Sequence, residues 1–157
     1  AYFGSSPQSL GGDLTVIASD SSGNEVHASV GVTDTVWTNF GGAFPGAHGE
    51  PQLLPSGSLQ GGSQAKLSLS NGAESAQALM FFSYSSTPVQ LKCLTLQAFP
   101  IAATFDLVTD GQGEIDMGTV WPAGVPAGLE FWFQIAIADQ ASPCGLSISN
   151  AVQGLTP

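Results

Sequence analysis

Residues 119–139 read TVWPAGVPAGLEFWFQIAIAD, and the second half of this stretch decides the fold. Between residues 129 and 138, apolar side chains occupy both odd and even positions, with Glu130 and Gln134 as the polar exceptions. The run is too short to cross the roughly 30 Å hydrocarbon core of a bilayer as a helix. A strand that is apolar on both faces needs protein on each side, from its own chain or from a partner chain. We therefore expect a central strand that is covered on both faces.

Around this stretch, short runs rich in β-branched and aromatic residues recur about every ten residues, each bounded by turn residues. No uninterrupted stretch repeats apolar residues at helical spacing. The expected strands cover residues 14–18, 26–32, 35–40, 65–69, 78–84, 89–96, 102–108, 113–120, 129–138 and 145–152. The turn sequences SDSSGNE at 19–25 and VTDGQGE at 108–114 favour hairpins. The pattern predicts an all-β fold, an antiparallel β-sandwich of immunoglobulin-like or jelly-roll-like type.

The stretch from residue 41 to residue 63, GGAFPGAHGEPQLLPSGSLQGGS, interrupts the run of strands with many Gly and Pro residues. It is typical of a linker, and it then separates an N-terminal β segment, residues 1–45, from a sandwich body, residues 46–157. A long surface loop within one sandwich explains the same composition. Both interpretations stay open from the sequence.

The N-terminal segment alternates clearly between apolar and polar positions, and its apolar positions include Leu14, Val16, Val26, Val30 and Val32. Such a segment can fill a groove in its own sandwich or in a neighbour's, where main-chain hydrogen bonds give affinity and alternate side chains fix the register. Head-to-tail donation that does not close on itself makes a filament. The sequence predicts these five residues as assembly contacts, with pairing inside the chain as the alternative.

The composition limits the partners. Charged residues are 9% of the chain, and 12 acidic residues against two lysines give a net charge of -10 at pH 7. Binding to nucleic acids or anionic membranes depends on Lys and Arg, so neither partner is expected. Copies of the chain itself, and uncharged molecules such as glycans, remain as expected partners.

Cys93 and Cys144 are the two cysteines, and their separation does not fit a metal-ligand motif. A disulfide between them would close a long loop, stabilise the fold by roughly 4 kcal/mol, and indicate an oxidising compartment. Two unrelated buried thiols are the alternative. Residues 1–12 show neither the basic start nor the apolar run of a signal peptide, as expected of a mature secreted chain. We expect an extracellular or cell-surface location.

The sequence offers little for catalysis. His27 and His48 are the histidines, and a Ser-His-Asp arrangement would need one of them beside a nucleophile, yet no G-x-S-x-G motif is present. Both histidines are expected at the surface. We predict no catalytic residues, no cofactor and no enzymatic activity.

Four carboxylates cluster in FDLVTDGQGEID: Asp106, Asp110, Glu114 and Asp116. They are weak candidates for a Ca²⁺ site, because their spacing matches no known calcium loop. A pair of them could also serve glycoside hydrolysis if held 5–9 Å apart in a cleft. The Asp110-Gly111 pair is what a turn requires in any case, so the turn is the favoured interpretation.

Tryptophans could bind sugars by stacking. Trp132 is expected in the core because it lies inside the apolar run. Trp37, in a strand with polar neighbours, and Trp121, before Pro122, are the candidates for a glycan-stacking platform, although core packing is the favoured interpretation for Trp121.

The C-terminal part of the chain resembles a β-rich domain found in secreted, mostly uncharacterised proteins of environmental bacteria. The resemblance lies in GSLQGGSQAKLSLSNG, ALMFFSYSSTPV, VTDGQGE, WPAGVPAGLEFWFQIAIAD and GLSISNAV, and it covers residues from about 50 to 157. It implies export and a β-sandwich, and it implies no activity or catalytic residue.

Two functional hypotheses follow from the sequence. The first is a secreted, non-enzymatic structural subunit that assembles into an extracellular filament or surface layer by exchange of its N-terminal strands. The alternative is an extracellular carbohydrate-binding β-sandwich module, which needs Trp37 and Trp121 exposed and coplanar on one sheet face.

Overall fold

A computed structural model of the protein describes residues 13–19, 25–31 and 36–157. The chain divides into two compact units, Ala1–Thr35 and Val36–Pro157. In the first unit, β1 (Asp13–Ser19) and β2 (Glu25–Gly31) form a two-stranded antiparallel sheet by themselves. The register makes Leu14 the partner of Val30 and Ser19 the partner of Glu25. The antiparallel pair expected on either side of residues 19–25 is therefore confirmed.

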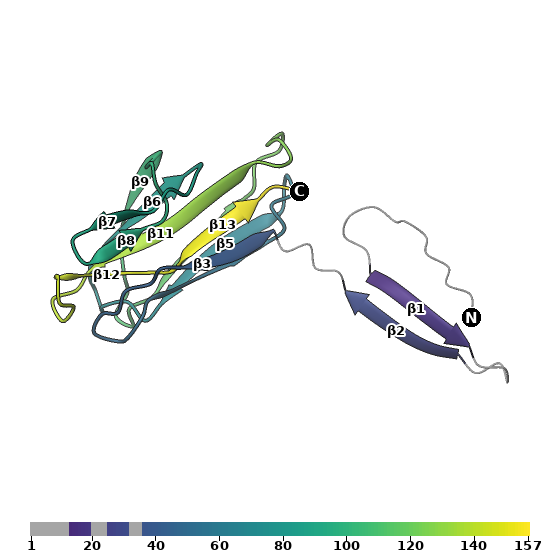
Figure 1. The fold of residues 1–157 in the computed structure, drawn as a ribbon, viewed down its shortest axis with the longest axis horizontal. Coiled ribbons are helices and arrows are strands. Elements are labelled where there is room, and N and C mark those ends of the chain that lie inside the picture. The colour runs from purple at the N-terminus through teal and green to yellow at the C-terminus, as the bar shows by residue number, and fades with distance from the viewer. Residues whose placement is uncertain (1–12, 20–24, 32–35) are drawn as a thin grey trace. The chain divides into compact units, whose positions relative to one another are not determined.

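The second unit is a β-sandwich of antiparallel sheets, with no helix in residues 36–157 (Figure 1). The larger layer has the strand order β3–β13–β11–β6–β9, and β12 also pairs with β11. Its strands are β3 (Trp37–Gly41), β6 (Gln77–Ser83), β9 (Ala103–Val108), β11 (Glu130–Ala138), β12 (Leu146–Ile148) and β13 (Ala151–Leu155). The smaller layer has the order β10–β5–β4, with β4 (Gln52–Ser56), β5 (Gln64–Ser70) and β10 (Ile115–Val120). The prediction of an all-β sandwich is confirmed.

The main core lies between the two layers and is built on alternate residues of each strand. From β11, Phe133, Ile135 and Ile137 pack towards the smaller layer. They meet Leu67 and Leu69 of β5, whose intervening residues are polar. Because successive side chains of a strand point to opposite faces, this alternation places one apolar row of each sheet in the core.

The other face of β11 is covered by a short hairpin of the same chain, β7 (Val89–Leu91) and β8 (Leu94–Leu96). Trp132 of β11 packs there with Phe81 of β6 and with Leu94 and Leu96 of β8. The two-sided apolar run from 129 to 138 therefore does form a strand covered on both faces, and the structure provides both covers within one chain.

Gln134, in the middle of the apolar run, is completely buried on this second face. Its Oε1 accepts the backbone N–H of Gln97 at 2.8 Å, and its Nε2 donates to the carbonyls of Ser149 at 3.0 Å and Thr95 at 3.2 Å. A buried amide is tolerated when its donors and acceptor are satisfied. Here the three bonds also tie the covering hairpin and its following loop to the sheet.

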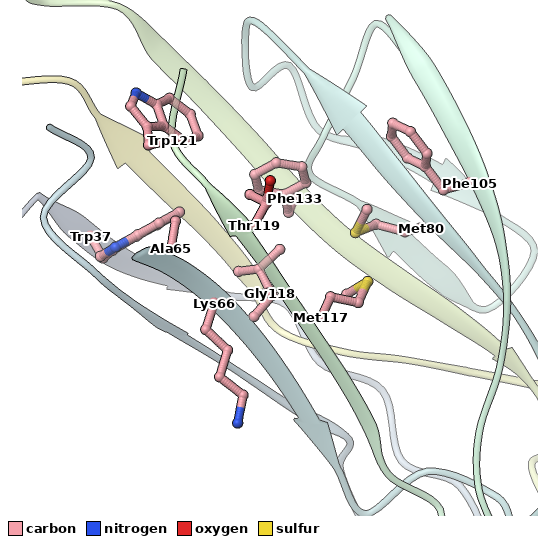
Figure 2. A pocket seen from close by; sticks show the side chains of 11 residues that line it. Trp37, Ala65, Lys66, Met80, Phe105, Met117, Gly118, Thr119, Trp121 and Phe133 are labelled. Carbon is pink, nitrogen blue, oxygen red and sulfur yellow. The ribbon is translucent and has the colours of Figure 1, made fainter. Parts of the chain in front are cut away.

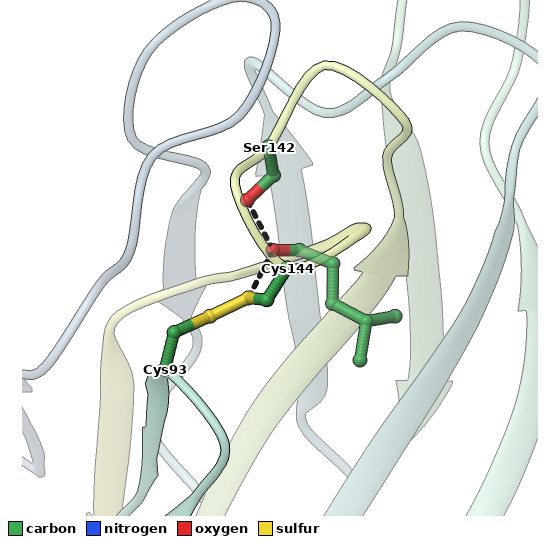
Figure 3. The surroundings of a disulfide bond; sticks show 4 residues. Cys93, Ser142 and Cys144 are labelled. Carbon is green, nitrogen blue, oxygen red and sulfur yellow. Dashed lines mark hydrogen bonds between the residues drawn. A yellow bond between two sulfur atoms is a disulfide. The ribbon is translucent and has the colours of Figure 1, made fainter.

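The disulfide Cys93–Cys144 is present, as predicted (Figure 3). It joins the turn of the β7–β8 hairpin to the loop between β11 and β12, with 6.3 Å between the two Cα atoms. The disulfide therefore fastens the turn of the hairpin to the sheet, whereas Gln134 holds the other end of β8. Beside it, the hydroxyl of Ser142 and the sulfur of Cys144 both approach the carbonyl oxygen of Leu146.

The boundary between the two units differs from the one expected at residue 45. It falls between Thr35 and Val36, and β3 belongs to the sandwich as the edge strand beside β13. The stretch from 41 to 63 is not a linker, because it contains β4, where Leu53 is fully buried in the core. This short strand was not predicted, because it is surrounded by Gly and Pro residues and Leu53 is its single buried leucine.

Two expected strands are interrupted. Residues 89–96 form the β7–β8 hairpin, which turns at Lys92 with φ of 56°. Residues 145–152 divide into β12 and β13, because the side chain of Ser149 replaces a strand partner: its Oγ accepts the N–H of Ile135 at 3.0 Å. In both places, a local turn or side-chain bond overrides the apolar pattern.

No helix in the described part of the chain is long and apolar enough to span a membrane.

Candidate functional site

The two long sides of the sandwich differ, and the difference defines the candidate site. On the side of β3 and β4, the buried side chain of Asn150 connects the layers. Its Oδ1 accepts the N–H of Leu53 at 2.7 Å, and its Nδ2 donates to the Leu53 carbonyl at 3.0 Å. The Nδ2 group also lies 3.2 Å from Oδ1 of Asn39 on β3. The Asn150 amide thus gives Leu53 the two hydrogen bonds that a neighbouring strand residue would give. It links the two layers on this side, which we call the closed side.

The other side is bounded by β9 and β10, which are consecutive in the chain but lie in different layers. Within residues 36–157, β9 pairs with β6 alone and β10 with β5 alone. The turn between them is therefore a crossing between layers, and the hairpin predicted at 108–114 is wrong. Both strands present an edge that no other described strand covers.

The crossing turn has a clear local cause. Oδ1 of Asp110 accepts the backbone N–H groups of Gln112 at 2.8 Å and Glu114 at 2.9 Å. Gly113 has φ of 74° and lies against the backbone of Gly72, so that a Cβ at this position would collide with the Gly72 carbonyl. Only glycine fits here without a shift of the backbone. The turn is thus held against the 71–73 loop, and the chain leaves β9 for the other layer.

An apolar groove with a volume of about 430 Å³ lies between the layers and extends from these edges to Trp37 and Trp121 (Figure 2). Phe105 lines it from β9, and Met117 and Thr119 line it from β10. Met80 and Phe133, from the neighbouring strands β6 and β11, complete its centre. Ligand sites commonly have volumes of about 300–1,000 Å³ and mostly apolar walls. By size and lining, this groove is the candidate functional site.

Exposure rises steeply from the interior of the groove to its rim. Met80 is 7% exposed, whereas Phe105 is 47% exposed although it is the direct strand partner of Met80 and lies on the same face. A half-exposed phenylalanine on the inner face of a sandwich indicates an incompletely covered core.

Lys66 is the one charged residue that lines the groove. Its Nζ lies 3.1 Å from Oδ1 of Asp116 on β10, and both side chains are largely exposed. The pKa of Asp116 is lowered from the ordinary 3.8, first by a hydrogen bond from the Ser68 side chain and then by Lys66. A pair this exposed adds little to stability. The groove has no acid–base pair for chemistry, and its lining suits an uncharged, apolar occupant.

The two tryptophans predicted for sugar stacking both border the groove, but they do not form a flat platform. Trp121 stacks on Phe131 at an interplanar angle of 24°, whereas Trp37 meets the same ring edge-on at 85°. The two indoles are therefore far from coplanar. Trp37 also donates from Nε1 to the carbonyl of Gly57 at 2.9 Å, a bond that holds β3 to the chain after β4.

The four carboxylates proposed for calcium are dispersed. Asp106 lies on β9, and Asp110 caps its own turn. Asp116 lies on β10 and pairs with Lys66 of β5. Among the described residues, no group of three His, Cys, Asp or Glu side chains could hold a metal ion. Asp110 thus has the turn role that its sequence favoured.

Of the histidines, His48 is at the surface, with Nε2 3.7 Å from Glu74 Oε1. His27 lies in β2. Four of the five predicted assembly residues lie in the hairpin, Leu14 and Val16 in β1, and Val26 and Val30 in β2; Val32 lies outside the described residues.

Sequence reasoning missed the groove and the Asn150 bridge. The groove residues stand in separate strands, and each looks like an ordinary core position until the layer crossing is known. A signal for Asn150 did exist: a polar Ser-Asn pair interrupts an apolar strand pattern at 149–150. Such an interruption marks side chains that bond to neighbouring backbone.

Comparison with known proteins gives no family. No family model matches the chain, and no curated protein matches it. Among solved structures, a DUF3823 family protein from Bacteroides uniformis is similar with a TM-score of 0.39 and 12% sequence identity, covering 97% of this chain and 77% of that chain.

Proposed function

We propose that the protein is a secreted, non-enzymatic structural subunit that assembles into an extracellular filament or surface layer by exchange of its N-terminal strands. The observation that carries this proposal is the separate two-stranded sheet. β1 and β2 pair with each other and belong to the first of the two compact units of the chain. An isolated two-stranded hairpin is at best marginally stable in water and gains stability from a further strand or an apolar surface.

The register of the hairpin supports this role. Leu14 is the Cα partner of Val30, Val16 of Ala28, and Ala18 of Val26. Every second position of one strand is thus apolar and stands opposite an apolar position of the other. This pattern matches a strand pair that is added to another sheet, where alternate side chains fix the register.

Assembly by such a segment is head to tail, because the donor and the acceptor are different parts of the chain. Contacts of this kind form rings or open filaments according to the rotation between subunits. Secretion is supported by the disulfide, because such bonds persist in oxidising compartments.

The charge of the chain predicts how assembly depends on salt. Both units are acidic, and the whole chain carries -10 at pH 7, so copies repel one another. Added salt screens this repulsion over a Debye length of about 10 Å at 0.1 M. We expect assembly to strengthen as the salt concentration rises from about 10 mM to about 0.5 M, the reverse of binding driven by ion pairs.

The proposal is tested with the full chain by light scattering after size exclusion and by electron microscopy. Val16→Lys, at an apolar position of β1, should leave the chain monomeric. Thr15→Lys, at the neighbouring polar position, is the matched control and should assemble like the wild type. A wild-type chain that stays monomeric at high protein and salt concentration would refute the proposal.

The carbohydrate-binding alternative has less support, because Trp37 and Trp121 lie at a large angle to each other. Specific binding to a glycan array that is lost in Trp121→Ala would favour it instead.

A further inference from the structure

We infer that the groove between β9 and β10 is the acceptor site for assembly, and that the strand it accepts is β1 of a second copy of the chain. This inference rests on the proposed function and adds to it the place where the exchanged strand binds.

The edges of the groove provide the main-chain partners. β9 and β10 each have one edge without a strand partner among residues 36–157. Such an edge presents a row of backbone N–H and C=O groups that an added strand can pair with. β1 has seven residues, and β9 and β10 have six each, so the lengths match.

The lining of the groove provides the contacts for side chains. Phe105, Met117 and Met80 form an apolar surface that is half covered at its rim. In β1, the alternate residues Leu14, Val16 and Ala18 are all apolar. A strand laid along the groove therefore brings one apolar row onto an apolar surface, and a shift by one residue would place Thr15 there instead.

The charges favour β1 over β2. Lys66 is the single charged residue of the lining, and the rest of the lining is neutral. β1 begins with Asp13 and is uncharged from Leu14 to its end, whereas β2 begins with Glu25 and contains His27. Lys66 lies on the outer face of β5 and pairs with Asp116, so the inward-facing residues of the groove are all uncharged. A strand that is uncharged beyond its first residue fits this neutral lining.

Cysteine cross-linking between two singly substituted full-length chains tests the site. The wild-type cysteines are both in the disulfide, so an added thiol reacts alone. One chain carries Val16→Cys, and the other carries Thr119→Cys at the rim of the groove. We expect these two chains to form a disulfide-linked dimer on mixing and oxidation, with the bond mapped by mass spectrometry. The matched control replaces Thr119→Cys by Leu54→Cys, which is exposed on the edge strand β4, and should cross-link at least tenfold less.

A second pair of variants tests the groove without cysteines. Phe105→Lys places a charge at the rim and should weaken association at least tenfold. Val108→Lys, on the same strand but outside the groove lining and 65% exposed, should leave association unchanged. Both residues are largely exposed, so both variants should fold, which circular dichroism verifies.

The outcomes separate the two proposals. If the wild type assembles, but the cross-link forms with Leu54→Cys or association survives Phe105→Lys, the acceptor site is wrong and assembly stands. A cross-link inside a single chain that carries both Val16→Cys and Thr119→Cys would show that the groove takes its own strand, which overturns the second copy as partner. A small apolar molecule found on the wild-type monomer by native mass spectrometry, and absent from Phe105→Lys, would also overturn it. Failure of the wild type to assemble refutes both proposals.

Discussion

The two long sides of the sandwich are built from similar strands, yet one is closed and the other is open. On the β3–β4 side, Asn150 bonds both backbone groups of Leu53, and the indole of Trp37 bonds the carbonyl of Gly57. On the β9–β10 side, Phe105 remains half exposed beside an apolar groove. Specific hydrogen bonds across the layers therefore distinguish the closed side from the open one.

The closed side shows what an added strand would have to supply on the open one. Asn150 offers an acceptor and a donor to one residue of β4, which is the bonding that a neighbouring strand residue gives. A strand in the groove would offer the same kind of bonds along several residues of β9 or β10. Substitutions that remove the bonds of the closed side, and measurements of side-chain packing on the open side, test this difference.

The largest loss of stability is expected from removal of the disulfide, which fastens the β7–β8 hairpin to the larger sheet. The double variant Cys93→Ser/Cys144→Ser removes a cross-link between residues 51 positions apart. The loss of constraint on the unfolded chain should lower the free energy of unfolding by about 4 kcal/mol. Urea denaturation followed by tryptophan fluorescence measures it.

If the β7–β8 hairpin is stabilised separately from the two sides, loss of the disulfide should leave the strands at both sides protected. Hydrogen exchange should therefore increase in β7 and β8 more than in β4 or β10. Equal increases throughout the sandwich would show that the cover and the two sides form one cooperative unit.

Asn150→Ala opens the closed side. It leaves the N–H and C=O groups of Leu53 buried without their partner, at about 1–3 kcal/mol for each unsatisfied group. We expect a loss of about 3 kcal/mol in urea denaturation. The control, Gln77→Ala, removes an exposed amide from β6 and should change stability by less than about 0.5 kcal/mol. A loss for Asn150→Ala no larger than that of the control would mean that its three bonds do not close this side.

Packing on the open side should weaken from the centre of the groove to its rim. Met80→Ala removes a buried side chain and should cost about 2–3 kcal/mol, near the lower limit for buried methionines because it lies beside the groove. Met117→Ala, at a partly buried position on the edge strand β10, should cost about 1 kcal/mol. Thermal or urea unfolding of the monomeric Val16→Lys background gives both values without a contribution from assembly. Equal costs at the two positions would show that the groove is as tightly packed as the core.

The sequence was sufficient to predict the buried strands that build the layers, but not which strands lie at the edges of each layer. The apolar run from 129 to 138 predicts β11 and its two covers, because a strand with both faces apolar has few other solutions. The pair Cys93 and Cys144 likewise predicts the disulfide. Short-range patterns report the burial of each residue, and burial is what builds the layers.

The open side could not be predicted because it depends on which strands are neighbours. The turn at 108–114 has the composition of a hairpin, but the close approach of Gly113 to Gly72 sends β10 to the other layer. The stretch that contains β4 reads as a linker, because its two buried leucines, Leu53 and Leu59, lie six residues apart and give no periodic signal. Contacts between distant segments decide both cases, and these are absent from any local pattern.

The smallest effect concerns the ion pair on the outer face of the open side. The pKa of Asp116 is lowered from 3.8 by a hydrogen bond with Ser68, by a hydrogen bond with Lys66 and by the charge of Lys66. A lowered pKa in the folded state means that the stabilising contribution is present above pH 3.8 and is lost as the pH falls through the folded-state value. Ser68→Ala and Lys66→Gln should therefore each raise the pKa of Asp116 towards 3.8.

Carbon-13 NMR titration of the Asp116 carboxyl measures these shifts directly. In the monomeric background, neither variant should change the unfolding midpoint at pH 7 measurably, because both side chains of the pair are largely exposed. An unchanged pKa of Asp116 in Ser68→Ala would show that the hydrogen bond across β5 and β10 does not hold this carboxylate in its charged form. An unchanged pKa in Lys66→Gln would show the same of the ion pair.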